Sequence, residues 1–224
     1  MSESRDTVLG TIRRSLGVTG REAPRRDAVD GRIAAARPGV VPARGQLPEA
    51  DRLNLFCDKA VASAATVARV ASAADVPGEV ARFLRDSNLP ATLRMGADPT
   101  LQSMPWSETV LDVSRGRSDG SDINGLSRAF GAVAETGTLA LVSGQDNPTT
   151  LNFLPDNHIV VIEARDVAGD YEAVLARLRD RYGKGTMPRT LNFVTGPSRS
   201  ADIEQQLILG AHGPRRLHVV VVEG

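Results

Sequence analysis

A chain of 224 residues is long enough to bury a hydrophobic core without disulfides or structural metals, as one sizeable domain with a tail or as two small domains. Its 27 basic and 27 acidic residues balance, which argues against a mainly electrostatic hold on nucleic acid. The single cysteine, Cys57, excludes a disulfide within the chain and any thiolate metal or iron–sulfur site built from this chain alone. The N-terminal sequence lacks the apolar core of a signal peptide, and no apolar run approaches the roughly 18 residues of a membrane span, so we expect a cytoplasmic protein.

The N-terminal part of the chain shows one short helical pattern followed by a long unpatterned stretch. Apolar residues recur at helical spacing over residues 4–16, and a glycine follows as a stop; the apolar residues are Val8, Leu9, Ile12 and Leu16. A helix with one apolar stripe is not stable alone, so we expect it to dock on its own domain or on a partner subunit. Residues 17–50 are rich in Gly, Pro, Arg and Ala and predict an extended or disordered linker. We therefore divide the chain into an N-terminal helix at 1–17, a linker at 18–47 and a folded domain at 48–224.

Strand and helix patterns alternate along the folded domain. Helices are predicted over 49–65, 76–87, 124–134, 170–182 and 201–209, and strands over 66–70, 91–95, 110–113, 138–143, 158–164, 191–195 and 217–222. This alternation predicts an α/β fold with a mainly parallel sheet that helices cover on both faces. The uninterrupted apolar runs 159–162 and 219–222 agree, because strands that are buried on both faces lose their polar alternation.

The turn at residues 134–138, Ala-Glu-Thr-Gly-Thr, is the first of three candidate sites. It precedes a predicted buried strand, and Gly137 allows backbone angles that a side chain would forbid, or the close approach of a ligand. Glu135 could act as a base, as a nucleophile or as an acceptor for a ligand hydroxyl. Alternatively, Glu135, Thr136 and Thr138 satisfy backbone groups at the entrance of the strand.

The second candidate is the segment 195–204, which follows one predicted strand and opens the predicted helix 201–209. Ligands of open parallel sheets bind beyond the carboxyl ends of the strands, and a helix N-terminus attracts anions. Ser198 and Ser200 could cap the helix or bind a carboxylate or phosphate, and Arg199 could add a bidentate charge. Asp202 and Glu204 would lie in the first turn and already complement the helix dipole, so a well-capped helix without a ligand is the alternative.

The third candidate is His212, which follows the same predicted helix in the sequence Gly-Ala-His-Gly-Pro. A histidine at a helix C-terminus is favoured in its protonated form and could serve as a general acid or base, or it could simply cap the helix. His158, which opens a predicted strand after a turn, is a weaker candidate, and His218 is expected to be packed in the core. Three histidines without ligand spacing make a poor metal site, so we expect no metal. Neither a dinucleotide-binding glycine motif nor a phosphate-binding loop is present.

Three segments together resemble a known family. The segments AETGTL (134–139), LNFLPDNHIVVIEA (151–164) and GPSRSADIEQQLILGAHGP (196–214) resemble the lactate utilization protein C family, whose shared region is called the LUD domain. The likeness covers about the C-terminal half of the chain, and the N-terminal helix also resembles the opening of that family.

This resemblance carries implications for fold and function. It implies a three-layer α/β/α fold with a mainly parallel sheet, of the NagB/RpiA/CoA-transferase type. It implies a three-protein system that oxidises L-lactate to pyruvate, in which lactate utilization proteins A and B carry cysteine-ligated iron–sulfur clusters and this chain carries no cofactor. In CoA transferases of the wider fold group a catalytic glutamate occupies a turn like that of Glu135, although fold similarity does not fix function.

Two functions therefore remain open at the level of sequence, together with a pure assembly role. The first is a substrate-handling subunit of a lactate-oxidising complex. The second is a stand-alone protein that uses Glu135, either a CoA-transferase-like enzyme with Glu135 as the nucleophile or a small-carboxylate- or phosphate-binding protein. The expected site has Glu135 and His212 as catalytic residues, with the substrate bound by Thr136, Gly137, Thr138, Gly196, Ser198, Arg199, Ser200 and Asp202.

Overall fold

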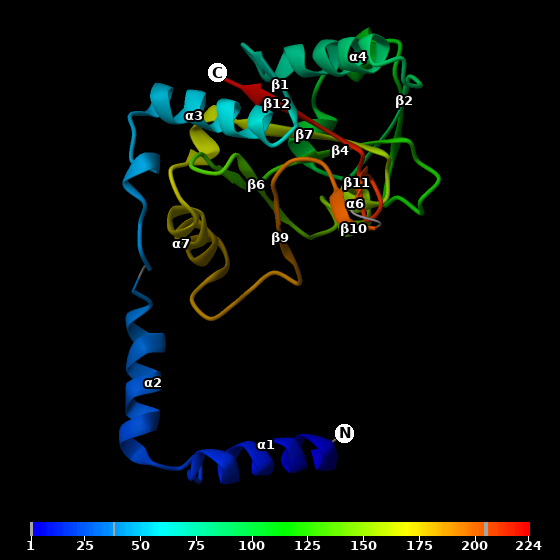
Figure 1. Ribbon diagram of the computed structural model, residues 1–224. Helices are drawn as coiled ribbons and strands as arrows, with labels where there is room; N and C mark the ends of the chain where they lie inside the picture. The colour runs from blue at the N-terminus through cyan, green and yellow to red at the C-terminus, as the bar shows by residue number, and fades with distance from the viewer. Residues whose placement is uncertain (1, 38, 204–205) are drawn as a thin grey trace. The chain divides into compact units, whose positions relative to one another are not determined.

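The computed structural model describes residues 2–37, 39–203 and 206–224, and its contacts divide the chain into two compact units, Met1–Val40 and Val41–Gly224 (Figure 1). The first unit contains helix α1 (Ser2–Leu16), which confirms the helix expected there. It also contains helix α2 (Ala23–Ala35), so the expectation of an extended or disordered chain is wrong for these residues. Pro24 lies in the first turn of α2, where its missing N–H leaves no bond unmade, and the interior is alanine- and arginine-rich. The expected domain boundaries remain a prediction.

The second unit is built on a six-stranded sheet. Its strands are β1 (Thr66–Val70), β2 (Thr92–Met95), β3 (Asp112–Arg115), β4 (Asn124–Arg128), β7 (Asn157–Glu163) and β12 (Arg216–Val222), in the spatial order β1-β12-β7-β4-β2-β3. Every neighbouring pair is parallel. The predicted α/β fold with a mainly parallel sheet is therefore confirmed.

Alternate residues of the central strands feed two separate cores. Val160 and Ile162 of β7 pack with helix α3 (Glu49–Ala62) on one face of the sheet. Ile159 and Val161 pack on the other face with helix α4 (Val76–Asp86) and the short helix α5 (Pro99–Gln102). Burying each such side chain stabilises the fold by about 1.5–3 kcal/mol, which is why these strands carry no polar alternation.

A second, smaller sheet covers the α3 side. It contains β8 (Val167–Ala168), β5 (Gly131–Val133), β6 (Thr138–Val142) and β9 (Leu191–Val194), in that spatial order. Helix α7 (Tyr171–Tyr182) packs on it through Val174. Asp170 caps this helix by accepting a hydrogen bond from the amide of Ala173 at 2.9 Å.

The helix expected over 124–134 does not form, because these residues are strands β4 and β5. Leu126, Phe130 and Val133 mimic a helical period, but β4 lies inside the sheet between β2 and β7. Gly125 marks this position: a Cβ there would lie 2.8 Å from the carbonyl oxygen of Leu151. Burial on both faces therefore overrides the helical spacing.

The helix expected over 201–209 is also absent. The chain instead forms an antiparallel pair of strands, β10 (Arg199–Ile203) and β11 (Gln206–Leu209), in which Arg199 is opposite Leu209. Asp202 is thus in a strand and not in a first helical turn, whereas Glu204 lies outside the described residues. The predicted helix-N-terminal anion site and the predicted C-terminal cap at His212 are both wrong, because the described residues 199–203 and 206–209 are strands and supply neither a helix terminus nor a helix dipole.

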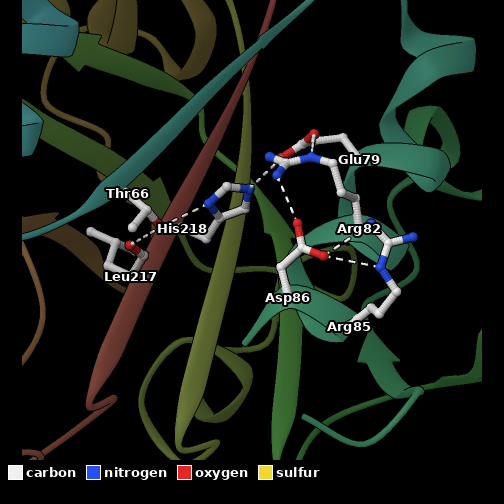
Figure 2. Close-up of polar contacts among 7 residues, drawn as sticks. All are labelled: Thr66, Glu79, Arg82, Arg85, Asp86, Leu217 and His218. Atoms are coloured by element: carbon white, nitrogen blue, oxygen red, sulfur yellow. Dashed lines mark hydrogen bonds and ion pairs between the residues drawn. The ribbon is translucent and has the colours of Figure 1, made fainter. Parts of the chain in front are cut away.

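His218 is packed in the core, as expected, and Figure 2 shows its ring between Thr66 and Glu79. Its ring stacks on Phe83 with centroids 4.0 Å apart, and its Nδ1 lies 2.8 Å from the hydroxyl of Thr66. Its Nε2 is 3.2 Å from a carboxylate oxygen of Glu79, without hydrogen-bond alignment, and Arg82 pairs with the same carboxylate. Burial lowers the pKa of His218 to about 4 in spite of the opposing effect of Glu79. This neutral histidine thus links helix α4 to strand β12 and to the edge strand β1.

Candidate functional site

A cavity of about 280 Å³, here called the amino-end cavity, lies at the amino ends of β7 and β12. Helix α6 (Thr149–Phe153), strand β7, the turn after β9 and the loop before β12 supply its walls. The lining residues are Asn152, Phe153, His158, Phe193, Val194, Gly196, Pro197, Ser198, Arg199, His212, Gly213, Pro214 and Leu217. The site thus lies at the opposite end of the strands from the carboxyl ends where parallel sheets usually bind ligands.

Backbone hydrogen bonds tie two distant segments together at one wall. The amide of Ser198 donates to the carbonyl of Pro214 at 2.8 Å, and the amide of Gly210 donates to the carbonyl of Ser198 at 2.9 Å. Gly196 has a φ of +74°, and a Cβ there would lie 2.1 Å from the carbonyl oxygen of Ser63. The glycine is therefore required for the close packing of this turn against the end of α3.

Asn152 is the most informative residue of the cavity. Its side chain is 1% exposed, yet neither its amide nitrogen nor its amide oxygen has a hydrogen-bond partner among the described residues. Leaving a buried polar group unsatisfied costs about 1–3 kcal/mol. A buried donor and acceptor in a cavity wall are suited to binding a ligand that offers both functions.

His158 is a second buried polar group in the same wall. Its Nε2 lies 2.7 Å from the hydroxyl of Ser127, while its Nδ1 has no partner among the described residues. Burial lowers the pKa of His158 to about 3, so the imidazole is neutral at physiological pH. It can exchange hydrogen bonds with a ligand, but it is a weak base.

The remaining polar lining residues come from the predicted site. Ser198, Arg199 and His212 all line the cavity, and Arg199 and His212 are exposed at its edge. Arg199 forms no ion pair with a described side chain. Ser200 does not line the cavity, and the side chain of Asp202 is outside the described part of the chain. Of the second and third candidate segments, the structure therefore brings together Gly196, Ser198, Arg199 and His212.

The turn around Glu135 does not belong to this cavity. Glu135 is 6% exposed, and a carboxylate oxygen accepts a hydrogen bond from Nε of Arg44 at 3.2 Å. Gly137 has a φ of +67°, and a Cβ there would lie 2.4 Å from the amide nitrogen of Ala60. The positive φ and the close contact with α3 both require glycine at this position. The backbone of α3 fills the space beside Gly137, so no ligand can approach it there.

A chain of hydroxyl groups links the two predicted regions. Thr138 lies 2.7 Å from Thr136, 3.0 Å from Tyr171 and 2.6 Å from Thr195, measured between side-chain oxygens. Thr195 directly precedes Gly196 at the cavity. Within the described part of the chain, Thr136 and Thr138 therefore bond to each other and to neighbouring hydroxyl groups, and not to the backbone groups that the alternative interpretation of the sequence named.

Sequence reasoning missed the buried amide of Asn152 and ranked His158 too low. Asn152 stands between two apolar residues of a short segment, so only its burial reveals it. His158 follows a turn and starts an apolar strand, a position that could have marked it as a residue at the edge of the sheet. Within residues 2–37, 39–203 and 206–224, no group of three His, Cys, Asp or Glu side chains is arranged to hold a metal ion. No described helix is long and apolar enough to cross a membrane.

The comparisons with known proteins agree with this architecture. The LUD domain family model matches residues 115–222, a range that contains every lining residue of the amino-end cavity. Lactate utilization protein C of Deinococcus radiodurans is 32% identical over 206 residues, and the match covers 85% of this chain and 90% of that relative. The chain belongs to the lactate utilization protein C family. The resemblance found in the sequence is thereby confirmed.

Two further similarities differ in extent. Lactate utilization protein C of Geobacillus sp. (strain WCH70) is 38% identical over 91 residues, so the match covers 40% of this chain and 38% of that family member. The crystal structure of a DUF162 family protein from Deinococcus radiodurans is similar with a TM-score of 0.56 and 26% identity, over 79% of this chain and 99% of that one. The fold is therefore shared along most of the chain, whereas the strongest sequence similarity is local.

Proposed function

We propose that this chain is the cluster-free, substrate-handling subunit of a cytoplasmic system that oxidises L-lactate to pyruvate together with iron–sulfur partner proteins. Membership of the lactate utilization protein C family supports a role in lactate utilization. The observation that carries the finer proposal is the unpartnered, buried amide of Asn152 beside the neutral His158 in a small cavity with Arg199 at its edge.

The cavity offers complementary groups for both ends of a 2-hydroxy acid. Arg199 presents a permanent positive charge and several donors to a carboxylate, and the hydroxyl of Ser198 adds another donor. The amide of Asn152 and the Nδ1 of His158 can bind the 2-hydroxyl group, which both donates and accepts. At about 280 Å³ the cavity suits a small ligand.

The oxidation of lactate to pyruvate releases two electrons and two protons. In our proposal His212 accepts the hydroxyl proton, because it lines the cavity and Glu135 does not. The C2–H bond would break as its electron pair passes to the partners, lactate utilization proteins A and B, whose iron–sulfur clusters would supply the oxidising chemistry, and the second proton would be released to solvent. This chain supplies no cofactor in this scheme, and a single cysteine cannot ligate a cluster.

The proposal is tested by measuring L-lactate binding calorimetrically with the wild-type chain and with Arg199→Gln. A hydrogen bond to a charged group contributes about 1.5–3 kcal/mol, so we expect the dissociation constant to rise by about tenfold or more. Arg189→Gln is the matched control, since it removes the same charge from an exposed position before β9 that does not line the cavity.

Reconstitution with the two partner proteins tests the assignment to a complex. Lactate-dependent reduction of a dye should require this chain, and Arg199→Gln should raise KM for lactate. An assembly that oxidises lactate equally well without the chain, together with no lactate binding by the chain alone, would contradict the proposal.

A further inference from the structure

A second cavity lies at the other end of the six-stranded sheet. It has a volume of about 390 Å³ and is lined in part by residues at or just beyond the carboxyl ends of β2 and β4, among them Asp98 and Arg128. The next strand of this sheet after β2 is β3, on one side of β2, and the next after β4 is β7, on the opposite side of β4. The carboxyl ends of two neighbouring strands whose connections diverge form the position where open α/β sheets bind ligands. We call this space the carboxyl-end cavity.

Two arginine side chains of this cavity are held in place by neighbouring groups and still have guanidinium N–H donors without a described partner. Nε of Arg128 donates to one oxygen of Asp98 at 3.0 Å, and the other oxygen accepts from the amides of Thr100 and Leu101. Asp98 is thus fully engaged, and the Nη groups of Arg128 bond to no described residue. Arg181 lies over the ring of Phe130 at 5.6 Å and forms no ion pair with a described carboxylate. Both guanidinium groups can therefore receive anionic oxygens.

A buried acceptor faces the same ligand space. Asn147 is 7% exposed, and its Nδ2 donates to the carbonyl of Val142, but its Oδ1 has no partner among the described residues. Its loop is fixed against β2, because a Cβ on Gly96 would lie 2.0 Å from the carbonyl oxygen of Asp146. An unsatisfied acceptor beside two guanidinium groups is complementary to a ligand that is anionic and also carries a hydrogen-bond donor.

We propose that the carboxyl-end cavity is a second ligand site, which binds a small hydroxylated anion. Its carboxylate or phosphate oxygens accept hydrogen bonds from Arg128 and Arg181, and its hydroxyl donates to Oδ1 of Asn147. The exposed carboxylate of Asp146, also in the lining, disfavours a bare polyanion and favours a ligand with hydroxyl donors. The site is separate from the amino-end cavity, since the two share no lining residue.

The test is a titration of the isotope-labelled full chain followed by amide NMR, with glycerol 3-phosphate and glycerate as probes. Binding should shift the amides of Gly144, Asn147 and Phe130. Arg181→Gln removes a charged hydrogen bond to the anion, and Asn147→Asp places a negative charge beside it. Each variant should therefore weaken binding by about tenfold. Binding by glycerol 3-phosphate alone identifies a phosphate group as the anion, and binding by glycerate alone identifies a carboxylate; either supports the proposal.

Two control variants make the result specific. Arg179→Gln removes the same charge from an exposed position of α7 that does not line the cavity, and Arg199→Gln alters the amino-end cavity only. In both variants the probes should shift the amides of Gly144, Asn147 and Phe130 as they do in the wild type. The proposal is overturned if neither probe shifts these amides, or if Arg181→Gln and Asn147→Asp bind with wild-type affinity. The amide spectrum of each variant shows directly that the fold is intact.

Discussion

The two cavities at opposite ends of the six-stranded sheet present different chemistry. The amino-end cavity combines apolar walls with neutral buried groups, Asn152 and His158, and a single arginine at its edge. The carboxyl-end cavity is lined by two arginines and two aspartates on a less apolar surface. Neutral buried groups discriminate a ligand by its hydrogen-bonding pattern, while exposed charges favour any ligand of the right sign. One fold can thus carry a selective site and a more permissive one.

Of these tests, a fall in pH should have the largest effect, because two buried histidines are held in their neutral form. The pKa of His158 is lowered to about 3 and that of His218 to about 4, against about 6.5 in the unfolded chain. Between these values the unfolded state binds more protons, so stability is lost as pH falls below 6.5. We expect the free energy of unfolding to drop by roughly 4 kcal/mol between pH 7 and pH 5, measured by urea denaturation.

The variant His218→Gln tells whether the histidines cause this loss. It removes one of the two buried imidazoles, so the loss between pH 7 and pH 5 should fall to about half. A wild-type stability that is flat over this range would show that these side chains are not buried in their neutral form.

Replacing Asn152 by leucine should raise the stability of the fold and abolish ligand binding at the amino-end cavity. The amide has no partner among the described residues, so an apolar side chain of similar size should stabilise the fold by about 1–2 kcal/mol while L-lactate binding is lost. Asn157→Leu is the control: its amide nitrogen donates to Ile123 and Asn124, so this change should destabilise the protein. Destabilisation in both variants would mean that Asn152 is satisfied in the folded protein.

Glu135→Gln should have the smallest effect. The buried carboxylate pairs with an arginine whose side chain is 66% exposed, and glutamine keeps an oxygen that can accept the same hydrogen bond, so we expect a loss of stability of about 1 kcal/mol. Lactate binding and turnover in the reconstituted system should be unchanged, because Glu135 does not line either cavity. A loss of turnover by orders of magnitude, with the fold intact, would instead support a nucleophilic role in group transfer.

The sequence predicts the sheet better than it predicts the sites. Apolar runs such as 159–162 reveal doubly buried strands, since only the interior of a parallel sheet demands them. Strands β4 and β5 were predicted as a single helix because Leu126, Phe130 and Val133 share a helical period, which pairing with neighbouring strands overrides. Residues 201–209 likewise carry a pattern compatible with a helix, and pairing between β10 and β11 decides otherwise.

At the candidate site, the glycine and serine motif of residues 196–199 and His212 could be found from the sequence, because their composition is unusual. The buried polar partners could not be found in this way. Asn152 differs from a surface asparagine only in its packing, and packing depends on segments distant along the chain. For the same reason the sequence joined Glu135 to a site from which the structure separates it.

The position of β12 between β1 and β7 has a consequence for how the protein forms during synthesis. Thr66 at the start of β1 is paired with His218, 152 residues later, so the first strand of the sheet has no neighbour until the last strand is made. Until then β1 and the facing edge of β7 both expose unpaired backbone groups, and such edges are open to pairing with other chains. Completion of the sheet must therefore wait until residues 216–222 have left the ribosome, and truncations that remove β12 should yield chains that aggregate.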